Sequence, residues 1–267
     1  TDVVTDPVAW FDAFRVNDLF RGADGVLYAA GGGGGLGVVS IANDGTLGDV
    51  WAPGATIGRS FTVGQFRVAS DGYAVVSSNT GVDTMSRIDG SVGPDDWIEE
   101  GGNWATDGGS HGMLSLDVYN DEFYACGSRI IEPPKVFLPA AAPTGTGLEL
   151  DVVELSSGAF GWEGELWAID VDEGGIVAGG LDEDLHFGHV FTIDHASDAS
   201  NPDNWSDFNL ADVYPDDSTT IRGVCRNGDH VVAAGSFSVR ADGIVFESMD
   251  GGATWTYCDL NQGAGSD

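Results

Sequence analysis

Residues 166–180 read LWAIDVDEGGIVAGG, and this stretch decides the fold. An apolar segment comes first, a Glu-Gly turn interrupts it, and a second apolar segment ends in small residues. A tight turn between two strand-forming segments predicts a β-hairpin. The pattern recurs, with Asp-Gly, Asn-Asp or Asn-Gly at the turn, in residues 17–32, 64–79, 114–128 and 221–236. The chain is therefore built from repeats.

A third apolar segment follows each hairpin, and in most repeats a fourth segment carries a tryptophan. The third repeat differs, because residues 148–155 (LELDVVEL) stand in the place of the tryptophan segment. No helical periodicity of useful length appears. Four short antiparallel strands in about 50 residues are typical of a β-propeller blade. The tryptophans of the other repeats are Trp51, Trp97, Trp205 and Trp255.

The sequence thus predicts an all-β, five-bladed β-propeller of four-stranded antiparallel blades, as a single domain over residues 1–267. A four-stranded sheet with two apolar faces is not stable alone, so the blades are expected to pack on one another. Residues 6–12 (DPVAWFD) are similar to residues 201–207 (NPDNWSD). Residues 1–13 are therefore a candidate closing strand, unless they form an extra edge strand or the last repeat is miscounted. The expected blades are 14–55, 56–105, 106–158, 159–215 and 216–261.

Residues 248–255 read SMDGGATW and match the pattern S-x-D-x-G-x-T-W in full. This stretch resembles the Asp-box of BNR-repeat propellers, a superfamily that includes sialidases and non-enzymatic proteins. The resemblance implies a hairpin in which Asp and Ser oxygens accept backbone N–H bonds and the tryptophan packs below. Because the motif occurs in hydrolases, assembly factors and receptors, it implies no activity. The residues with this structural role are Ser248, Asp250, Gly252, Thr254 and Trp255.

The charge excludes some classes of partner. The chain has 10 basic and 43 acidic residues and a net charge of -33. Binding to nucleic acid needs clustered Lys and Arg, and anionic membrane surfaces repel such a chain, so neither partner is expected. No apolar run of about 18 residues is present, so membrane insertion is not expected either. Dense carboxylates and a single lysine are typical of saline habitats; the alternative is an ordinary acidic extracellular protein.

The first strand of each propeller blade lines the central channel, so ligands meet residues near the start of these strands. Arginines that converge there would bind a carboxylate or sulfate in bidentate fashion. The alternative is that each arginine pairs with one of the many carboxylates of the chain. The candidate ligand residues are Arg15, Asp18, Arg59, His111, Glu163 and Arg222.

Two functions follow as alternatives. The first is a non-enzymatic binding or scaffold module, secreted, periplasmic or on the cell surface, for a small ligand, a glycan or a protein; its signal peptide lies outside the sequence. The second is a glycan-acting hydrolase at the channel mouth, which needs two carboxylates roughly 5–10 Å apart. No catalytic residue is assigned, because so acidic a chain always offers such a pair. The candidate carboxylates are Asp18, Asp117, Glu163, Glu165 and Asp170.

No cofactor is predicted. His186 and His189 form an HxxH pattern, but this spacing does not place both rings on one face of a strand, and catalytic zinc needs three protein ligands. Residues 89–96 and 194–207 are rich in oxygen donors. A structural calcium ion is one interpretation of these loops, and solvated turns are the other.

Two further features concern packing. Cys126, Cys225 and Cys258 allow at most one disulfide, and their spacing favours buried core positions over a metal site. Residues 132–147 (EPPKVFLPAAAPTGTG) hold the only lysine and several prolines. We expect these residues to form an insertion loop on one face, either for binding or as an extended spacer.

Overall fold

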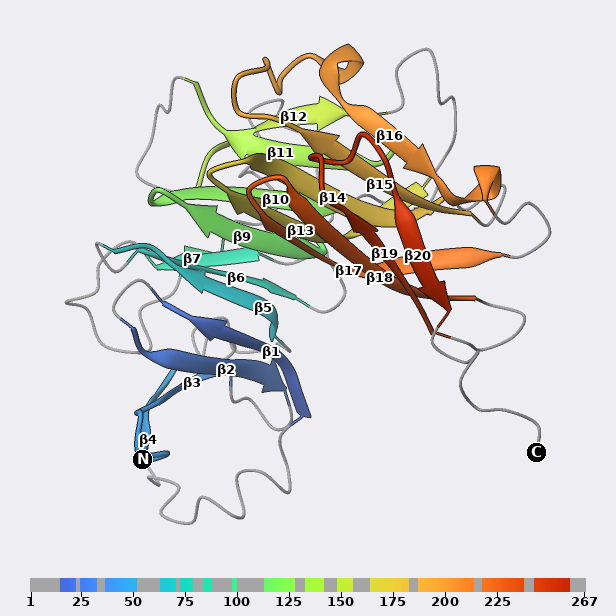
Figure 1. Cartoon of the computed structure of the whole chain (residues 1–267). Helices are drawn as coiled ribbons and strands as arrows, with labels where there is room; N and C mark the ends of the chain where they lie inside the picture. The colour runs from blue at the N-terminus through green and yellow to red at the C-terminus, as the bar shows by residue number, and fades with distance from the viewer. Residues whose placement is uncertain are drawn as a thin grey trace, which may run out of the picture. The chain divides into compact units, whose positions relative to one another are not determined.

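The structure is a computed structural model, and the part described here consists of five antiparallel sheets of four strands each, with no α-helix (Figure 1). The predicted all-β fold with four-stranded antiparallel sheets is confirmed. Residues 1–13, the candidate closing strand, lie outside this part. The described residues are 15–22, 25–32, 37–51, 63–70, 73–78, 84–87, 98–99, 113–127, 133–141, 148–155, 164–182, 187–213, 218–237 and 243–259.

The chain divides into two compact units, which we treat separately. Unit 1 comprises Thr1–Leu114 with Asn120–Glu122 and Ala142–Glu149, and unit 2 comprises the remaining residues. Unit 1 contains two sheets, and Tyr28 packs on Phe66 between them with ring centroids 5.1 Å apart. The strands are β1 (Arg15–Arg21), β2 (Leu27–Gly32), β3 (Val38–Ile41), β4 (Leu47–Trp51), β5 (Val63–Val68), β6 (Ala74–Ser78), β7 (Thr84–Arg87) and β8 (Ile98–Glu99).

Unit 2 holds the other three sheets, apart from the tip of the β9–β10 hairpin. In each sheet the strands pair in the order of the sequence. The strands are β9 (Ser115–Tyr119), β10 (Glu122–Gly127), β11 (Lys135–Pro139), β12 (Leu150–Glu154), β13 (Gly164–Asp172), β14 (Gly175–Asp182), β15 (Gly188–Ile193), β16 (Ser206–Asn209), β17 (Thr219–Asn227), β18 (His230–Phe237), β19 (Gly243–Ser248) and β20 (Thr256–Asp259).

The sheet β13–β16 is covered on both faces. Leu166 and Phe191 pack against residues of β10–β12, whereas Val177 and Val190 pack against residues of β17–β19. This arrangement explains why every residue of β15 is buried. Two apolar faces are what the repeat pattern predicted, and this sheet obtains stability by packing on its two neighbours in unit 2.

All five predicted hairpins are present, and β12 is the fourth strand of its sheet, as predicted for residues 148–155. The prediction of an insertion loop over residues 132–147 is wrong, because Lys135–Pro139 form the third strand of that sheet. Lys135 is buried and lies 3.6 Å from the Glu154 carboxylate on the paired strand β12. The prolines are tolerated because Pro134 precedes the strand and Pro139 ends it.

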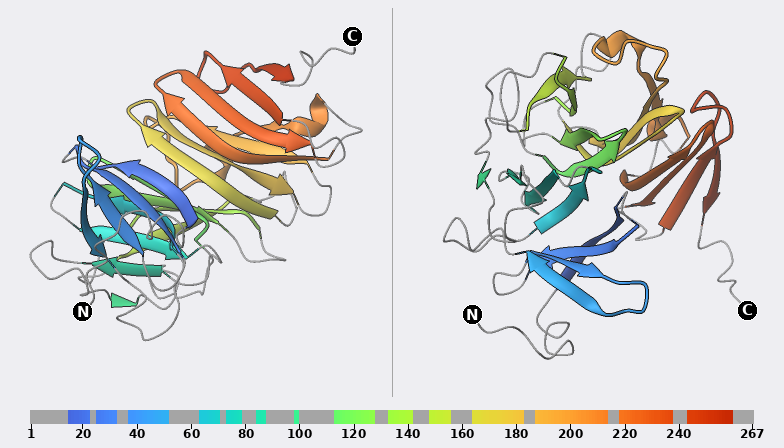
Figure 2. Two further views of the ribbon diagram at one scale, coloured as in Figure 1. Left: turned by 90° about the horizontal axis from the view of Figure 1, so that it is seen from below. Right: turned by 90° about the vertical axis from the view of Figure 1, so that its left-hand side faces the viewer.

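Side-chain oxygens connect the first strands of consecutive sheets. In unit 2, Asp117 accepts the backbone N–H of Val171 at 2.8 Å, and Asp170 accepts that of Arg226 at 2.6 Å. Ser115 on β9 also accepts the N–H of Ile169, and Asp172 at the end of β13 accepts that of Gly228. The order of these bonds shows that β9, β13 and β17 run in the same direction. Figure 2 shows β13 and β17 side by side, at the junction of their two sheets.

The same kind of bond occurs within unit 1. The Asp18 carboxylate on β1 accepts the N–H of Phe66 on β5 at 3.1 Å. In each of these contacts the earlier strand supplies the acceptor and the later strand supplies the donor. We call these contacts the strand rungs: Ser115–Ile169, Asp117–Val171, Asp170–Arg226 and Asp18–Phe66.

Candidate functional site

A register irregularity recurs at the same place in the first strands of four sheets. The pairing shifts between Leu166 and Ala168 in β13 and between Ile221 and Gly223 in β17, and β1 and β5 shift in the same way. Such a bulge places one extra residue on the first strand, outside the regular strand register, and changes the direction of its side chain. The bulged residues are Asn17, Gly64, Trp167 and Arg222.

In unit 2 the two bulged side chains meet. The Arg222 guanidinium carbon lies 3.0 Å from the centroid of the Trp167 ring, a cation–π contact between β17 and β13. The indole N–H of Trp167 donates to the Glu165 carboxylate at 2.7 Å. We call Glu165, Trp167 and Arg222 the bulge cluster.

The bulge cluster presents a cation at the surface. Arg222 is exposed, and its guanidinium has no hydrogen bond or ion pair with any described residue. Partial desolvation lowers the pKa of Arg222, whereas the negative charge of Glu165 raises it. The guanidinium stays protonated at neutral pH, since arginine does not lose its proton in proteins. Its N–H groups can therefore donate to an acceptor from outside the chain.

Cys225 lies three residues further along β17 than Arg222 and is exposed, so the prediction of a buried core position is wrong for this cysteine. Partial burial raises the pKa of the Cys225 thiol, and the negative charges of Asp170, Asp172 and Asp117 raise it further. The thiolate is the nucleophilic form of cysteine, so this environment makes Cys225 a poor nucleophile. Cys126 is fully buried, as predicted for a core cysteine, and burial also raises its pKa.

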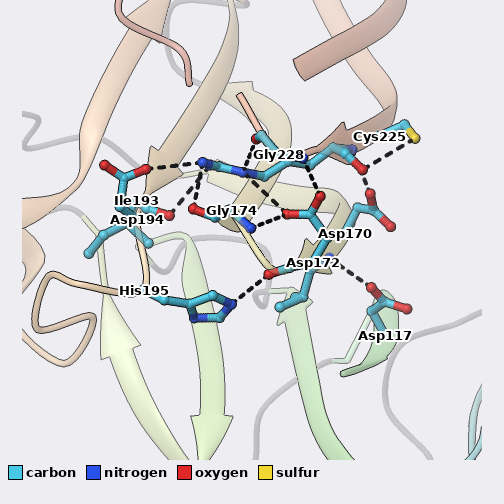
Figure 3. Close-up of polar contacts among 11 residues, drawn as sticks. Asp117, Asp170, Asp172, Gly174, Ile193, Asp194, His195, Cys225 and Gly228 are labelled. Atoms are coloured by element: carbon cyan, nitrogen blue, oxygen red, sulfur yellow. Dashed lines mark hydrogen bonds and ion pairs between the residues drawn. The ribbon is translucent and has the colours of Figure 1, made fainter. Parts of the chain in front are cut away.

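The end of β17 is held by a buried arginine. The Arg226 side chain has no exposed area, and it donates to the backbone oxygens of Gly174 at 2.7 Å and Gly228 at 3.0 Å. It also contacts the carboxylates of Asp194 at 3.0 Å and Asp172 at 3.5 Å. Its partners come from the turns of two sheets, and Figure 3 shows Gly174, Asp194 and Gly228 close to one another. This arrangement is structural, since every contact of the side chain serves the fold.

The hairpin of residues 248–255 lies at the same end of the strands. Thr254 donates to Asp250 through its hydroxyl at 2.6 Å and its N–H at 2.8 Å, and these bonds hold the pKa of Asp250 below its usual value. Gly252 donates its N–H to the Ser248 hydroxyl at 2.8 Å. Trp255 stacks on Phe208 of the preceding sheet, with centroids 5.0 Å apart. The hairpin thus connects two sheets.

The described residues include three of the six predicted ligand residues. Arg15 begins β1, while the Asp18 carboxylate binds Arg67 at 2.6 Å in addition to its strand rung. Arg222 belongs to unit 2, where it stacks on Trp167 and the negative charge of Glu165 acts on it. The sequence analysis did not single out Trp167 as a ligand residue, and Glu165 appeared there only among the candidate carboxylates. The other three, Arg59, His111 and Glu163, lie outside the described part.

The histidines and acidic loops do not assemble a metal site in the described part of the chain, where no group of three or more His, Cys, Asp or Glu side chains is arranged to hold an ion. His189 is buried and pairs with Asp207 at 2.9 Å. In the loop that follows β15, Asp194 contacts Arg226 and Asp198 accepts hydrogen bonds from Ser200. His186 and residues 89–96 lie outside the described residues. No helix in the described segments has the length and apolar character needed to span a membrane.

Comparison with known proteins places the fold among β-propellers. YCF48 bound to a D1 peptide superposes with a TM-score of 0.55 and 16% identity, over 92% of this chain and 67% of that one. An inactive H270A variant of virginiamycin B lyase from Staphylococcus aureus, solved with quinupristin, gives a TM-score of 0.59 and 10% identity, over 93% and 71%. At these identities the likeness shows the fold alone. No protein-family model and no curated protein sequence matches the chain.

Proposed function

We propose that this chain is a non-enzymatic binding module with an Asp-box-type, five-bladed β-propeller fold, and that its partner is a protein or peptide. The observation that carries the proposal is the bulge cluster: an exposed guanidinium that stacks on an indole and forms no hydrogen bond with a described residue. Arginine and tryptophan are the side chains enriched at the energetic centres of protein interfaces.

Two further observations support a binding role. Asp117 and Asp170 were candidates for a glycan hydrolase, but both carboxylates accept backbone N–H groups in strand rungs. Carboxylates that bond the main chain serve the fold, which favours binding over hydrolysis. In addition, YCF48, which is similar in fold, was solved with a peptide bound.

The proposal also covers where the protein occurs. A charge of -33 keeps the surface hydrated and fits a secreted or surface-associated protein of a saline environment. The blade boundaries given above and the closure of the ring by residues 1–13 belong to the same proposal.

The test is a binding screen with an immobilised library of short random peptides, run beside a glycan array and a hydrolysis assay on the same glycans. Wild-type protein should retain a subset of peptides, and Arg222→Ala and Trp167→Ala should lose them while keeping the wild-type circular dichroism and melting temperature. Arg21→Ala is the matched control, because Arg21 is an exposed first-strand arginine that only bonds its own turn, at Gly25. Release of sugar from any glycan, with no peptide retained, would overturn the proposal.

A further inference from the structure

The bulge cluster also indicates what kind of group it receives. We infer that Arg222 binds a single carboxylate on a peptide that carries no net negative charge, and that Glu165 sets this selectivity. The inference rests on the proposed function, and it adds the chemistry of the ligand and the role of a residue beside the cation.

The first step of the argument is the geometry of Arg222. The guanidinium is planar, and the Trp167 ring lies 3.0 Å from its carbon, so the indole covers one face. The opposite face and the N–H edge remain for a ligand, since no described residue bonds them. A planar fork of donors matches the two oxygens of a carboxylate, and a stacked guanidinium loses less rotamer freedom on binding.

The second step concerns Glu165. Its carboxylate accepts the Trp167 indole N–H at 2.7 Å and so fixes the ring on which Arg222 rests. Its negative charge also acts on Arg222, because it raises the pKa of the guanidinium against the lowering by partial desolvation. An incoming anion therefore meets one cation and one nearby anion, and each extra negative charge on the ligand adds repulsion without adding a bond.

The third step is the negative charge further along β17 and on the chain as a whole. Asp117, Asp170 and Asp172 act electrostatically on Cys225, which lies three residues beyond Arg222 on the same strand. The chain as a whole carries a charge of -33. Long-range repulsion thus disfavours polyanions, whereas basic or neutral residues beside the ligand carboxylate are attracted or tolerated. A peptide carboxylate in a neutral or basic context fits these conditions.

The experiment uses the full chain and a set of short synthetic peptides with net charges from negative to positive. Each peptide is made as the free acid and as the C-terminal amide, and with internal Asp or Glu or with Asn or Gln in their place. Fluorescence anisotropy then separates the two sources of carboxylate, the C-terminus and a side chain. We expect loss of the relevant carboxylate to weaken binding about 10- to 100-fold, the value for a charge-assisted hydrogen-bonded pair.

Two variants test the roles of the residues. Arg222→Gln should weaken binding by the same factor and remove the preference for the acid form, while Arg21→Gln, with the same loss of charge, should leave both unchanged. Glu165→Gln keeps an acceptor for the indole but removes the charge, so it should strengthen binding about 2- to 5-fold and admit peptides of net negative charge. A role of Glu165 confined to holding the ring would not produce this gain.

The outcomes are distinguishable. If peptides bind but acid and amide forms bind equally, or if Arg222→Gln has no effect, the carboxylate inference is wrong and the binding module stands. If Glu165→Gln weakens binding of acid peptides, its proposed role in selectivity is wrong. If no peptide binds at all, the proposed function itself fails.

Discussion

Gly252 lies directly against the Thr192 side chain of the preceding sheet, so a Cβ atom at position 252 would collide with the Thr192 hydroxyl. The glycine also has φ +103°, a conformation that side chains rarely adopt. Two independent reasons therefore require glycine here. One is the positive φ that the turn of the hairpin needs, and the other is the close contact of residue 252 with Thr192 of the neighbouring sheet.

Gly252→Ala should lower the free energy of unfolding by about 3 kcal/mol, from strain at positive φ and from overpacking. Gly251→Ala is the matched control, because Gly251 also has positive φ, at +71°, but its Cβ would meet only ordinary contacts. The control should cost about 1 kcal/mol. Urea unfolding of both variants measures the difference, and equal losses would contradict the steric role of Thr192.

Arg226→Met should strongly lower the free energy of unfolding, because the Arg226 side chain is fully buried. The substitution removes a donor from the carbonyl oxygens of Gly174 and Gly228, and it removes the positive charge beside the Asp172 and Asp194 carboxylates. Removing one partner of a buried charged network costs about 3–5 kcal/mol. Arg21→Met, at an exposed arginine, should change the unfolding free energy by less than about 0.5 kcal/mol. Similar stability of the two variants in urea would refute the structural role of Arg226.

Asp170→Asn should make the Cys225 thiol more reactive. Neighbouring carboxylates raise the pKa of this thiol, so at a given pH below that pKa less thiolate is present than for a free cysteine. Removing the charge of Asp170 lowers the pKa, so the rate of alkylation by iodoacetamide should rise severalfold, and the pH profile should move to lower pH. Mass spectrometry of the Cys225 peptide gives the rate.

The buried Cys126 provides the internal control for this measurement, because it should stay unlabelled in folded protein at every pH tested. Asn at position 170 still offers an oxygen to the Arg226 N–H, so the strand rung is kept. An unchanged rate at Cys225 would mean that burial alone raises its pKa.

Salt should raise the melting temperature. At a charge of -33 the folded chain repels itself, and added ions screen this repulsion. The rise should amount to several degrees and should occur mostly below about 1 M KCl, where the screening length shortens to roughly 3 Å. Differential scanning calorimetry over a KCl series measures it, and a flat or falling melting temperature would count against a saline setting.

The hairpins were predictable because their turn residues and apolar runs are local features of the sequence. The strand β11 was not, since Pro133, Pro134 and Lys135 together read as an exposed loop. What makes residue 135 a strand position is its pairing with Glu154, a contact between segments that the sequence alone does not bring together.

The bulge cluster was only partly predictable for a related reason. Arg222 followed from its place near the start of a first strand. Trp167 did not, because a bulge shifts the alternation of a strand by one residue and so changes which side chains face outward. No sequence signal indicates that Arg226 is buried while Arg222, four residues earlier on the same strand, is exposed.

The direction of the strand rungs bears on how the protein is made. The acceptors Ser115, Asp117 and Asp170 emerge from the ribosome 54 to 56 residues before their donors. Until the donor strand is synthesised, water can hydrate the carboxylate or hydroxyl acceptor, so the acceptor strand can fold without its partner. Each sheet can therefore fold as it is synthesised and offer a solvated template to the next one, so that assembly proceeds from the N-terminal side of each unit.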